Sequence, residues 1–254
     1  MNSKFTEKRL SKKVELSSAY LLVFHGSKDP RPNISVEKLK NMIKSQVEIS
    51  TKEKILIENA CLELGEFPLH EQIKRMGDRA LNLGYKELKI MPLFLLAGVH
   101  VMEDIPKEVN LAQRSFGDEL KIQLCPYLGS HKGLIEILAQ KQLEYEAETW
   151  ILIAHGSNRQ GFKRVMDLMG NRLNSVIAYW AIKPSLREQM IRLINQGYKN
   201  IGIMPYFLFP GGITDAIASE VIKLKQEFPQ IKVYMADTIG VNLEIVKLIW
   251  ELTQ

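Results

Sequence analysis

The stretch that decides the fold is AYLLVFHGS, residues 19–27, because a similar stretch, TWILIAHGS, returns 130 positions later (His25 to His155) over residues 149–157. In each copy a run of apolar residues ends on the tripeptide His-Gly-Ser. A second matching pair, GYKELKIMPLFL at 84–95 and GYKNIGIMPYFL at 197–208, follows in the same order. A repeat on this scale predicts two copies of one structural unit.

Within each copy, short apolar runs alternate with longer segments of helical period, which is the pattern of βαβ units and a parallel sheet. We therefore expect an α/β fold of two tandem similar halves, each a mainly four-stranded parallel sheet flanked by helices. We expect residues 1–17 to be a basic N-terminal tail, 18–146 the first half, which carries the metal site, and 147–254 the second, which lacks the full ligand set. The strands are expected near residues 19–25, 55–62, 88–95, 120–125, 149–155, 175–181, 201–208 and 231–236.

Composition narrows the class of protein. With 46% hydrophobic and 25% charged residues, the chain is typical of a globular protein. Its net charge of +5 favours anionic small ligands without the clustering of a nucleic-acid groove, and its apolar runs are too short to span a membrane. Cys61 and Cys125 form no CxxC motif, which argues against a disulfide framework or a zinc ribbon. A cytoplasmic location fits best, or the plastid stroma if the source is an alga.

Three residues of metal-binding types follow three predicted strands of the first half. His25 closes the first strand, Glu63 the second, and His100 follows the third. In an open parallel sheet these carboxyl ends meet at one edge, where ligands bind. Two imidazoles and one carboxylate suit divalent iron, cobalt or zinc, and three protein ligands leave coordination positions open. Each residue alone is more typical of a loop or core position, and only their joint placement predicts a metal site.

The second half serves as an internal control for this site. It keeps His155, but the alignment places Trp180 opposite Glu63 and Ile213 opposite His100. The sequence therefore predicts one working site, in the first half, with the second half acting as a wall, lid or stabilising partner.

The quoted motifs, taken together, resemble the sirohydrochlorin cobaltochelatases and ferrochelatases, the class II chelatases, in the long form that fuses both halves. The resemblance covers nearly the whole chain. The segments that carry it are LLVFHGSKDPR at 21–31, NACLEL at 59–64, MPLFLLAGVHVMEDIP at 91–106 and PYFLFPGGITD at 205–215.

This resemblance implies an enzyme, a metal chelatase that inserts Fe²⁺ on the way to sirohaem or Co²⁺ on the way to cobalamin. The metal would be bound by His25 and His100 with help from Glu63, below a tetrapyrrole in the cleft between the halves. It implies no cofactor beyond the divalent metal substrate and no nucleotide. From the composition we also expect no nucleic-acid and no membrane partner. Because both halves are fused, a monomer is expected. A histidine or glutamate of the site could accept the pyrrole protons.

Sirohydrochlorin is a polycarboxylate, so the cleft should offer cations and hydrogen-bond donors. Ser27, Lys28 and Arg31 are the candidates in the loop after the first strand. The alternatives are ordinary solvated surface for Lys28 and Arg31 and a helix cap for Ser27. Asp104 either orients His100 or begins a helix.

The remaining histidines carry less weight. We expect His70 to be exposed in an early helical turn and His131 to begin the fourth helix of the first half.

Two competing functions remain open from the sequence. A non-catalytic tetrapyrrole or metal carrier would use the same ligands. A flavodoxin-like or nucleotide-binding protein is suggested only by the layered sheet, and no GxGxxG, GxxxxGK[ST] or GxSxG motif supports it or a hydrolase.

Overall fold

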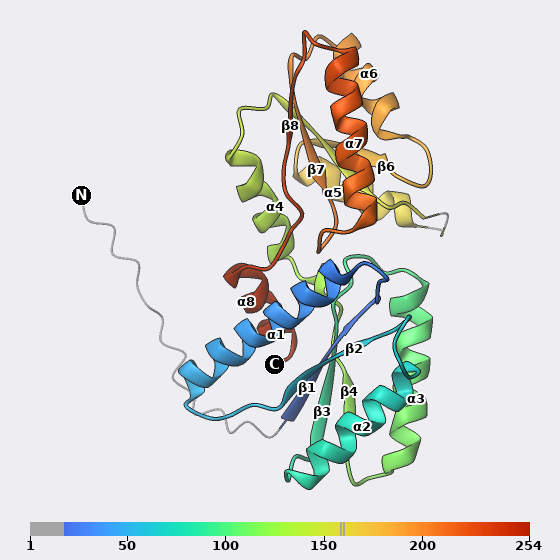
Figure 1. Ribbon diagram of the computed structural model, residues 1–254, viewed down its shortest axis with the longest axis vertical. Coiled ribbons are helices and arrows are strands. Elements are labelled where there is room, and N and C mark those ends of the chain that lie inside the picture. Colours follow the sequence, from blue (N-terminus) through green and yellow to red (C-terminus); the bar gives the residue numbers. More distant parts are fainter. Residues whose placement is uncertain (1–17, 158, 160) are drawn as a thin grey trace, which may run out of the picture.

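The computed structural model describes residues 18–157, 159 and 161–254, which form two four-stranded parallel sheets stacked along the long axis of the molecule (Figure 1). The strand orders are β2-β1-β3-β4 and β6-β5-β7-β8, so the two sheets share one topology. The predicted α/β fold of two similar halves is confirmed. The predicted basic tail, residues 1–17, lies outside the described residues.

Helices and strands alternate throughout the described chain. The first half contains β1 (Ser18–Phe24), α1 (Pro30–Thr51), β2 (Ile57–Cys61), α2 (Leu69–Asn82), β3 (Glu87–Pro92), a π-helical turn (His100–Asp104), α3 (Ile105–Phe116), β4 (Lys121–Leu124), a 3₁₀ turn (Leu128–Ser130) and α4 (Gly133–Leu143). The second contains β5 (Thr149–Ala154), α5 (Phe162–Arg172), β6 (Ser175–Tyr179), α6 (Leu186–Asn195), β7 (Asn200–Pro205), α7 (Gly212–Glu227), β8 (Lys232–Met235) and α8 (Leu243–Leu252).

Each central strand is buried on both faces, as parallel sheets require. Ala19, Leu21 and Val23 of β1 pack with α2 and α3, whereas the alternate residues Tyr20 and Leu22 face the opposite side. That opposite side belongs to one continuous apolar cluster that includes residues of both halves. The halves therefore share a core.

The last helix of each half packs on the other half. α8 lies against the first sheet, where the rings of Trp250 and Tyr20 have centroids 5.2 Å apart and Lys89 Nζ donates to the Thr253 carbonyl at 2.7 Å. Conversely, Gln142 of α4 donates to the Leu173 carbonyl and to Ser175 Oγ in the second half, at 3.0 and 2.9 Å. The two halves are thus interlocked by exchanged helices.

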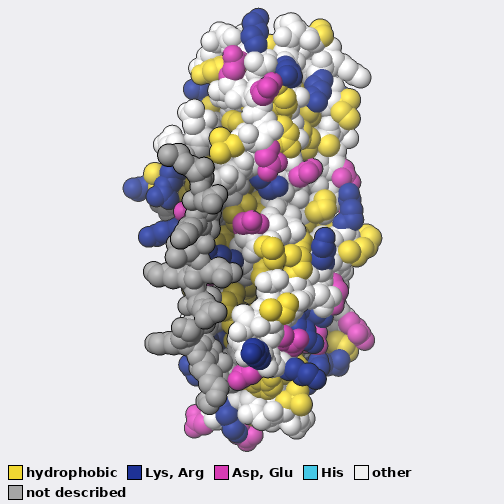
Figure 2. All heavy atoms as spheres, turned by 90° about the vertical axis from the view of Figure 1, so that its left-hand side faces the viewer, with side chains coloured by type: hydrophobic (Ala, Val, Ile, Leu, Met, Phe, Trp, Pro, Cys, Tyr) yellow, Lys and Arg dark blue, Asp and Glu magenta, His cyan; other side chains and the backbone are white. Residues whose placement is uncertain are grey.

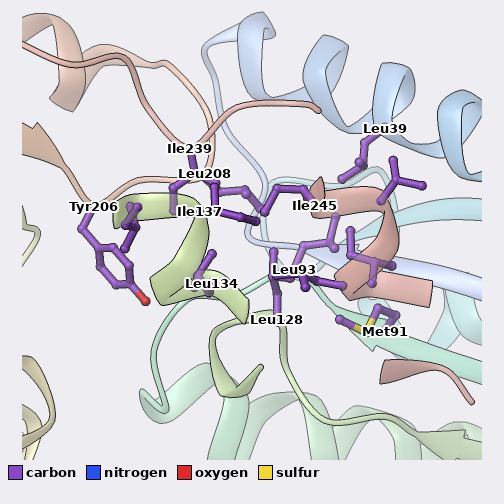
Figure 3. Close-up of a cluster of buried hydrophobic side chains, with 14 of the residues drawn as sticks. Leu39, Met91, Leu93, Leu128, Leu134, Ile137, Tyr206, Leu208, Ile239 and Ile245 are labelled. Carbon is purple, nitrogen blue, oxygen red and sulfur yellow. The ribbon is translucent and has the colours of Figure 1, made fainter. Parts of the chain in front are cut away.

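Figure 3 shows this shared cluster from inside. Ile245 of α8, Leu39 of α1 and Leu93 belong to it, as do Leu134 of α4 and Tyr206 of the second half. On the outer face shown in Figure 2, basic and acidic side chains are interspersed among apolar ones. None of the described helices is long and apolar enough to cross a lipid bilayer.

Trp250→Ala should destabilise the first sheet although the residue belongs to the second half. The half-buried indole packs on Tyr20, so we expect a loss of about 2 kcal/mol, less than the ~3–5 kcal/mol for a fully buried Trp. Hydrogen exchange should accelerate in β1 and β3. The matched control is Leu243→Ala, at the exposed start of the same helix, which should change stability by less than about 0.5 kcal/mol. Faster exchange confined to β5–β8 would contradict the exchanged packing.

Candidate metal site and cleft

The structure brings the three predicted ligands together. His25 follows β1, Glu63 follows β2 and His100 begins the π-helical turn after β3. One candidate ligand atom from each of the three lies within 4.8 Å of the other two. The predicted meeting of His25, Glu63 and His100 at one edge of the first sheet is confirmed, while their role as metal ligands stays a prediction.

A glycine allows the first two loops to approach each other. The backbone N–H of Glu63 donates to the His25 carbonyl at 2.9 Å, which continues the pairing of β1 and β2 beyond the strands. Between them, Gly26 has φ of +94°, and a Cβ at this position would lie 1.9 Å from the Glu63 carbonyl oxygen. Only glycine combines that left-handed backbone with so close a contact.

Both imidazoles use Nδ1 for orientation and leave Nε2 for a ligand. His25 Nδ1 lies 3.2 Å from the Gly26 carbonyl oxygen and His100 Nδ1 lies 2.8 Å from Asp104 Oδ2. A proton on Nδ1 donates in each contact and leaves the Nε2 lone pair free, as in many metal sites. The Asp104 side chain caps no helix. Of the two roles considered for Asp104, the contacts therefore favour orienting His100.

The gaps between the ligand atoms suit an ion. His25 Nε2 lies 3.9 Å from Glu63 Oε2, and His100 Nε2 lies 4.0 Å from Oε1. These separations are too long for hydrogen bonds. A tetrahedral divalent ion with bonds of ~2.0–2.2 Å holds its ligand atoms about 3.3–3.6 Å apart, so a small inward movement of these side chains would bind one. The side chains of His25 and Glu63 are 52% and 50% exposed, so the site is open to incoming ions.

The two histidines lie at a cleft of about 610 Å³ that both halves line. The first half contributes the loops after β1 and β3, and the second half contributes His155 and the loop after β7. Most of the lining side chains are aromatic or aliphatic, among them Phe24, Phe94, Phe207 and Phe209. The cleft therefore suits a large ligand with apolar faces.

The backbone register corrects one prediction for the second half. Glu63 N pairs with the His25 carbonyl, and the matching bond in the second half runs from Ala181 N to the His155 carbonyl at 2.8 Å. Ala181, not Trp180, is the counterpart of Glu63, so the prediction was wrong by one residue. The reason is a one-residue deletion in the loop after β6, which the sequence alignment placed upstream of that strand.

The other correspondence holds without a gap. Ile213 follows Pro205 of β7 by the same interval as His100 follows Pro92 of β3, and both lie in the first turn of the next helix. The second half thus keeps a histidine but has alanine and isoleucine where the first has its other two candidate ligands.

Of the three predicted substrate-binding residues, one lines the cleft and two do not. Ser27 lines the cleft, and its Oγ accepts the Asp29 N–H at 3.0 Å, which stabilises the turn before α1. The helix itself is capped by Asp29. Lys28 is exposed, and neither it nor Arg31 is among the described residues that line the cleft.

Arg31 joins the two halves near the cleft. Its guanidinium donates to Asp29 Oδ1 at 3.0 Å and to Asp215 Oδ1 of α7 at 2.9 Å. Hydrogen bonding to Arg31 holds the pKa of Asp29 down at about 2 and lowers the pKa of Asp215. The contact with Asp215 escaped the sequence reasoning, since 184 positions separate the partners and no local pattern links them.

The two remaining first-half histidines have structural contacts. His131 Nδ1 accepts the Gly133 N–H at 3.0 Å at the start of α4, which confirms the predicted helix-start role. His70 is half-buried and its Nδ1 lies 2.8 Å from Glu108 Oε2, so the prediction of an exposed side chain was wrong. The neighbouring helix α3 supplies that partner.

Comparisons with known proteins agree with this architecture. The sirohydrochlorin ferrochelatase of Priestia megaterium is 22% identical over 236 residues, covering 88% of this chain and 85% of the relative. The corresponding enzyme of Bacillus subtilis is 25% identical over 89% of this chain and 86% of its own length. The solved structure of SirB from Bacillus subtilis with Fe³⁺ superposes with a TM-score of 0.76, at 23% identity over 92% of this chain and 93% of that one, which shows the shared fold.

The family model named CbiX matches the chain twice, over residues 19–145 and 149–254, one match for each sheet. This chain therefore belongs to the CbiX family, with two copies of the family's unit in tandem.

Proposed function

We propose that this protein is a sirohydrochlorin chelatase that inserts Fe²⁺ or Co²⁺ into sirohydrochlorin. The observation that carries the proposal is the cluster of His25, Glu63 and His100 at a cleft shared by both halves. The relatives support it, because two proteins that this chain matches over 85% and 86% of their length are sirohydrochlorin ferrochelatases, and a cobaltochelatase of Priestia megaterium is 24% identical over 91% of this chain.

In this proposal the three clustered residues are the metal ligands and the catalytic residues of the first half. The imidazoles of His25 and His100 bind through Nε2, and the Glu63 carboxylate completes the set. Three ligands leave coordination positions for the incoming pyrrole nitrogens. The metal is a substrate, so the site has to release it, and the exposure of His25 and Glu63 favours loose binding.

The tetrapyrrole would lie between the two halves with its carboxylates toward the rim. Aromatic side chains of the cleft contact the macrocycle. Ser27 in the lining, together with Lys28 and Arg31 just outside it, binds its carboxylates. Arg31 is already paired with two aspartates, so a substrate carboxylate has to share or replace the bond to Asp215. The proposal includes no nucleotide and no cofactor other than the metal.

The proposal also places the protein as a monomer in a reducing compartment such as the cytoplasm. Both walls of the cleft come from one chain, so a second copy is not needed to complete it. Cys61 and Cys125 are both free thiols, and burial raises the pKa of Cys125 to about 11, which keeps that thiol protonated.

Removing either imidazole of the site should abolish metal binding. His25→Ala and His100→Ala each delete one of three ligands, so Co²⁺ affinity should fall by more than the ~10–100-fold typical of losing an outer hydrogen-bond partner of a ligand. Isothermal titration with Co²⁺ measures the affinity. His70→Ala, a histidine outside the cleft, is the control and should bind Co²⁺ like the unmodified protein. Equal affinity in all three variants would place the metal elsewhere.

Asp104→Asn tests the orientation of His100. The amide keeps the size of the side chain but loses the charge that fixes the Nδ1 proton, so Co²⁺ affinity should drop by about 10–100-fold with unfolding stability unchanged. The control is Asp118→Asn, which removes one negative charge from an exposed residue after α3. An unaltered affinity in Asp104→Asn, or the same drop in both variants, would remove Asp104 from the site.

The decisive experiment is an anaerobic initial-rate assay with free sirohydrochlorin and either Fe²⁺ or Co²⁺. The absorbance change of the macrocycle should show many turnovers per protein with at least one metal. The faster metal is the better substrate, which the ligand set leaves open because His and Glu suit both ions. Stoichiometric binding without turnover would instead support a carrier.

A further inference from the structure

Metal insertion into a tetrapyrrole releases protons, and the cleft has few groups that can take them. A divalent ion replaces the hydrogens of two pyrrole N–H groups, so each turnover yields two protons. Among the described residues that line the cleft, the ionisable side chains are His25, His100, His155 and Tyr206. Lysine, arginine and carboxylate side chains are missing from that described lining.

Three of these four side chains already have another role, either as candidate metal ligands or as a hydrogen-bond donor. The Nε2 atoms of His25 and His100 lie at the candidate metal site beside Glu63, where their lone pairs bind the ion. Tyr206 is buried, its hydroxyl donates to the Leu95 carbonyl at 3.2 Å, and burial raises its pKa. A neutral phenol that donates its proton to a carbonyl is a poor base, so His155 remains.

His155 has the orientation of a base. It closes β5 as His25 closes β1, and its Nδ1 lies 3.1 Å from the Gly156 carbonyl oxygen. With the proton on Nδ1, the Nε2 lone pair is free. The cationic residue of the same loop, Arg159, is paired with Glu103 at 3.2 Å. A neutral imidazole nitrogen can accept a proton and pass it on to water.

The second half has also lost the means to use His155 as a metal ligand. Ala181 and Ile213 stand where the first half has Glu63 and His100. Within the part of the chain that the structure describes, the cluster with metal-binding geometry is the one in the first half. His155 lies in the wall that the second half contributes, so a macrocycle between the halves has the metal ligands on one face and His155 on the other.

We propose that His155 is the base that accepts the pyrrole protons, on the face of the macrocycle opposite the entering metal. This inference rests on the proposed chelatase function. As the ion enters, one N–H bond breaks, the nitrogen lone pair binds the metal, and the proton moves to His155 Nε2. The exposed imidazolium releases that proton to water, and the neutral ring accepts the second.

The test compares His155→Ala and His155→Gln with the unmodified protein and with His70→Gln, which removes a histidine outside the cleft. The initial rate of insertion should fall by about 10²-fold or more in both His155 variants, the usual contribution of a positioned base. Affinities for Co²⁺ and for sirohydrochlorin, measured by titration without turnover, should stay close to those of the unmodified protein. His70→Gln should keep the full rate.

Chemical rescue distinguishes a base from a wall residue. Added imidazole should raise the rate of His155→Ala with increasing concentration, and should not raise the rate of the unmodified protein or of His155→Gln, whose side chain fills the space. A nearly unchanged rate in His155→Ala, a loss of sirohydrochlorin affinity that accounts for the slower rate, or the lack of rescue would each overturn the inference. If the unmodified protein inserts neither metal, the chelatase function itself fails, and this inference fails with it.

Discussion

The backbone hydrogen bond from Glu63 to the carbonyl of His25 is the contact on which the candidate site depends. It extends the pairing of β1 and β2 past the ends of both strands and so fixes a carboxylate beside an imidazole. Gly26 makes it possible, because any side chain there would overlap the Glu63 carbonyl. His100 then arrives from the other neighbour of β1, so the three groups meet because their strands are adjacent in the order β2-β1-β3.

The same backbone arrangement recurs in the second half with a different outcome. Ala181 repeats the hydrogen bond of Glu63, yet contributes no carboxylate. The repeat therefore preserves the main chain and the histidine while the remaining side chains diverge. Such an arrangement gives a cleft with two similar walls and two different chemistries, a cluster of candidate metal ligands on one side and the imidazole of His155 on the other.

The sequence predicted what depends on local pattern. Repeated apolar runs located all eight strands of the described residues, and the rule that loops after parallel strands converge brought His25, Glu63 and His100 together. It did not predict the ion pair between Arg31 and Asp215 or the packing of Trp250 on Tyr20, since both join segments whose spacing along the chain carries no signal. The alignment of Trp180 with Glu63 failed for a similar reason. The sequence does not show on which side of β6 one residue is deleted, and only the backbone hydrogen bonds fix the register.

The exchanged helices limit how the cleft can move. A hinge motion that separated the two halves would pull α8 away from the first sheet and α4 away from the second half. It would expose a continuous apolar cluster to water. The shared core therefore favours one spacing between the two walls of the cleft over a spacing that adjusts to each ligand. An opening of the cleft therefore has to be small enough to leave that cluster covered.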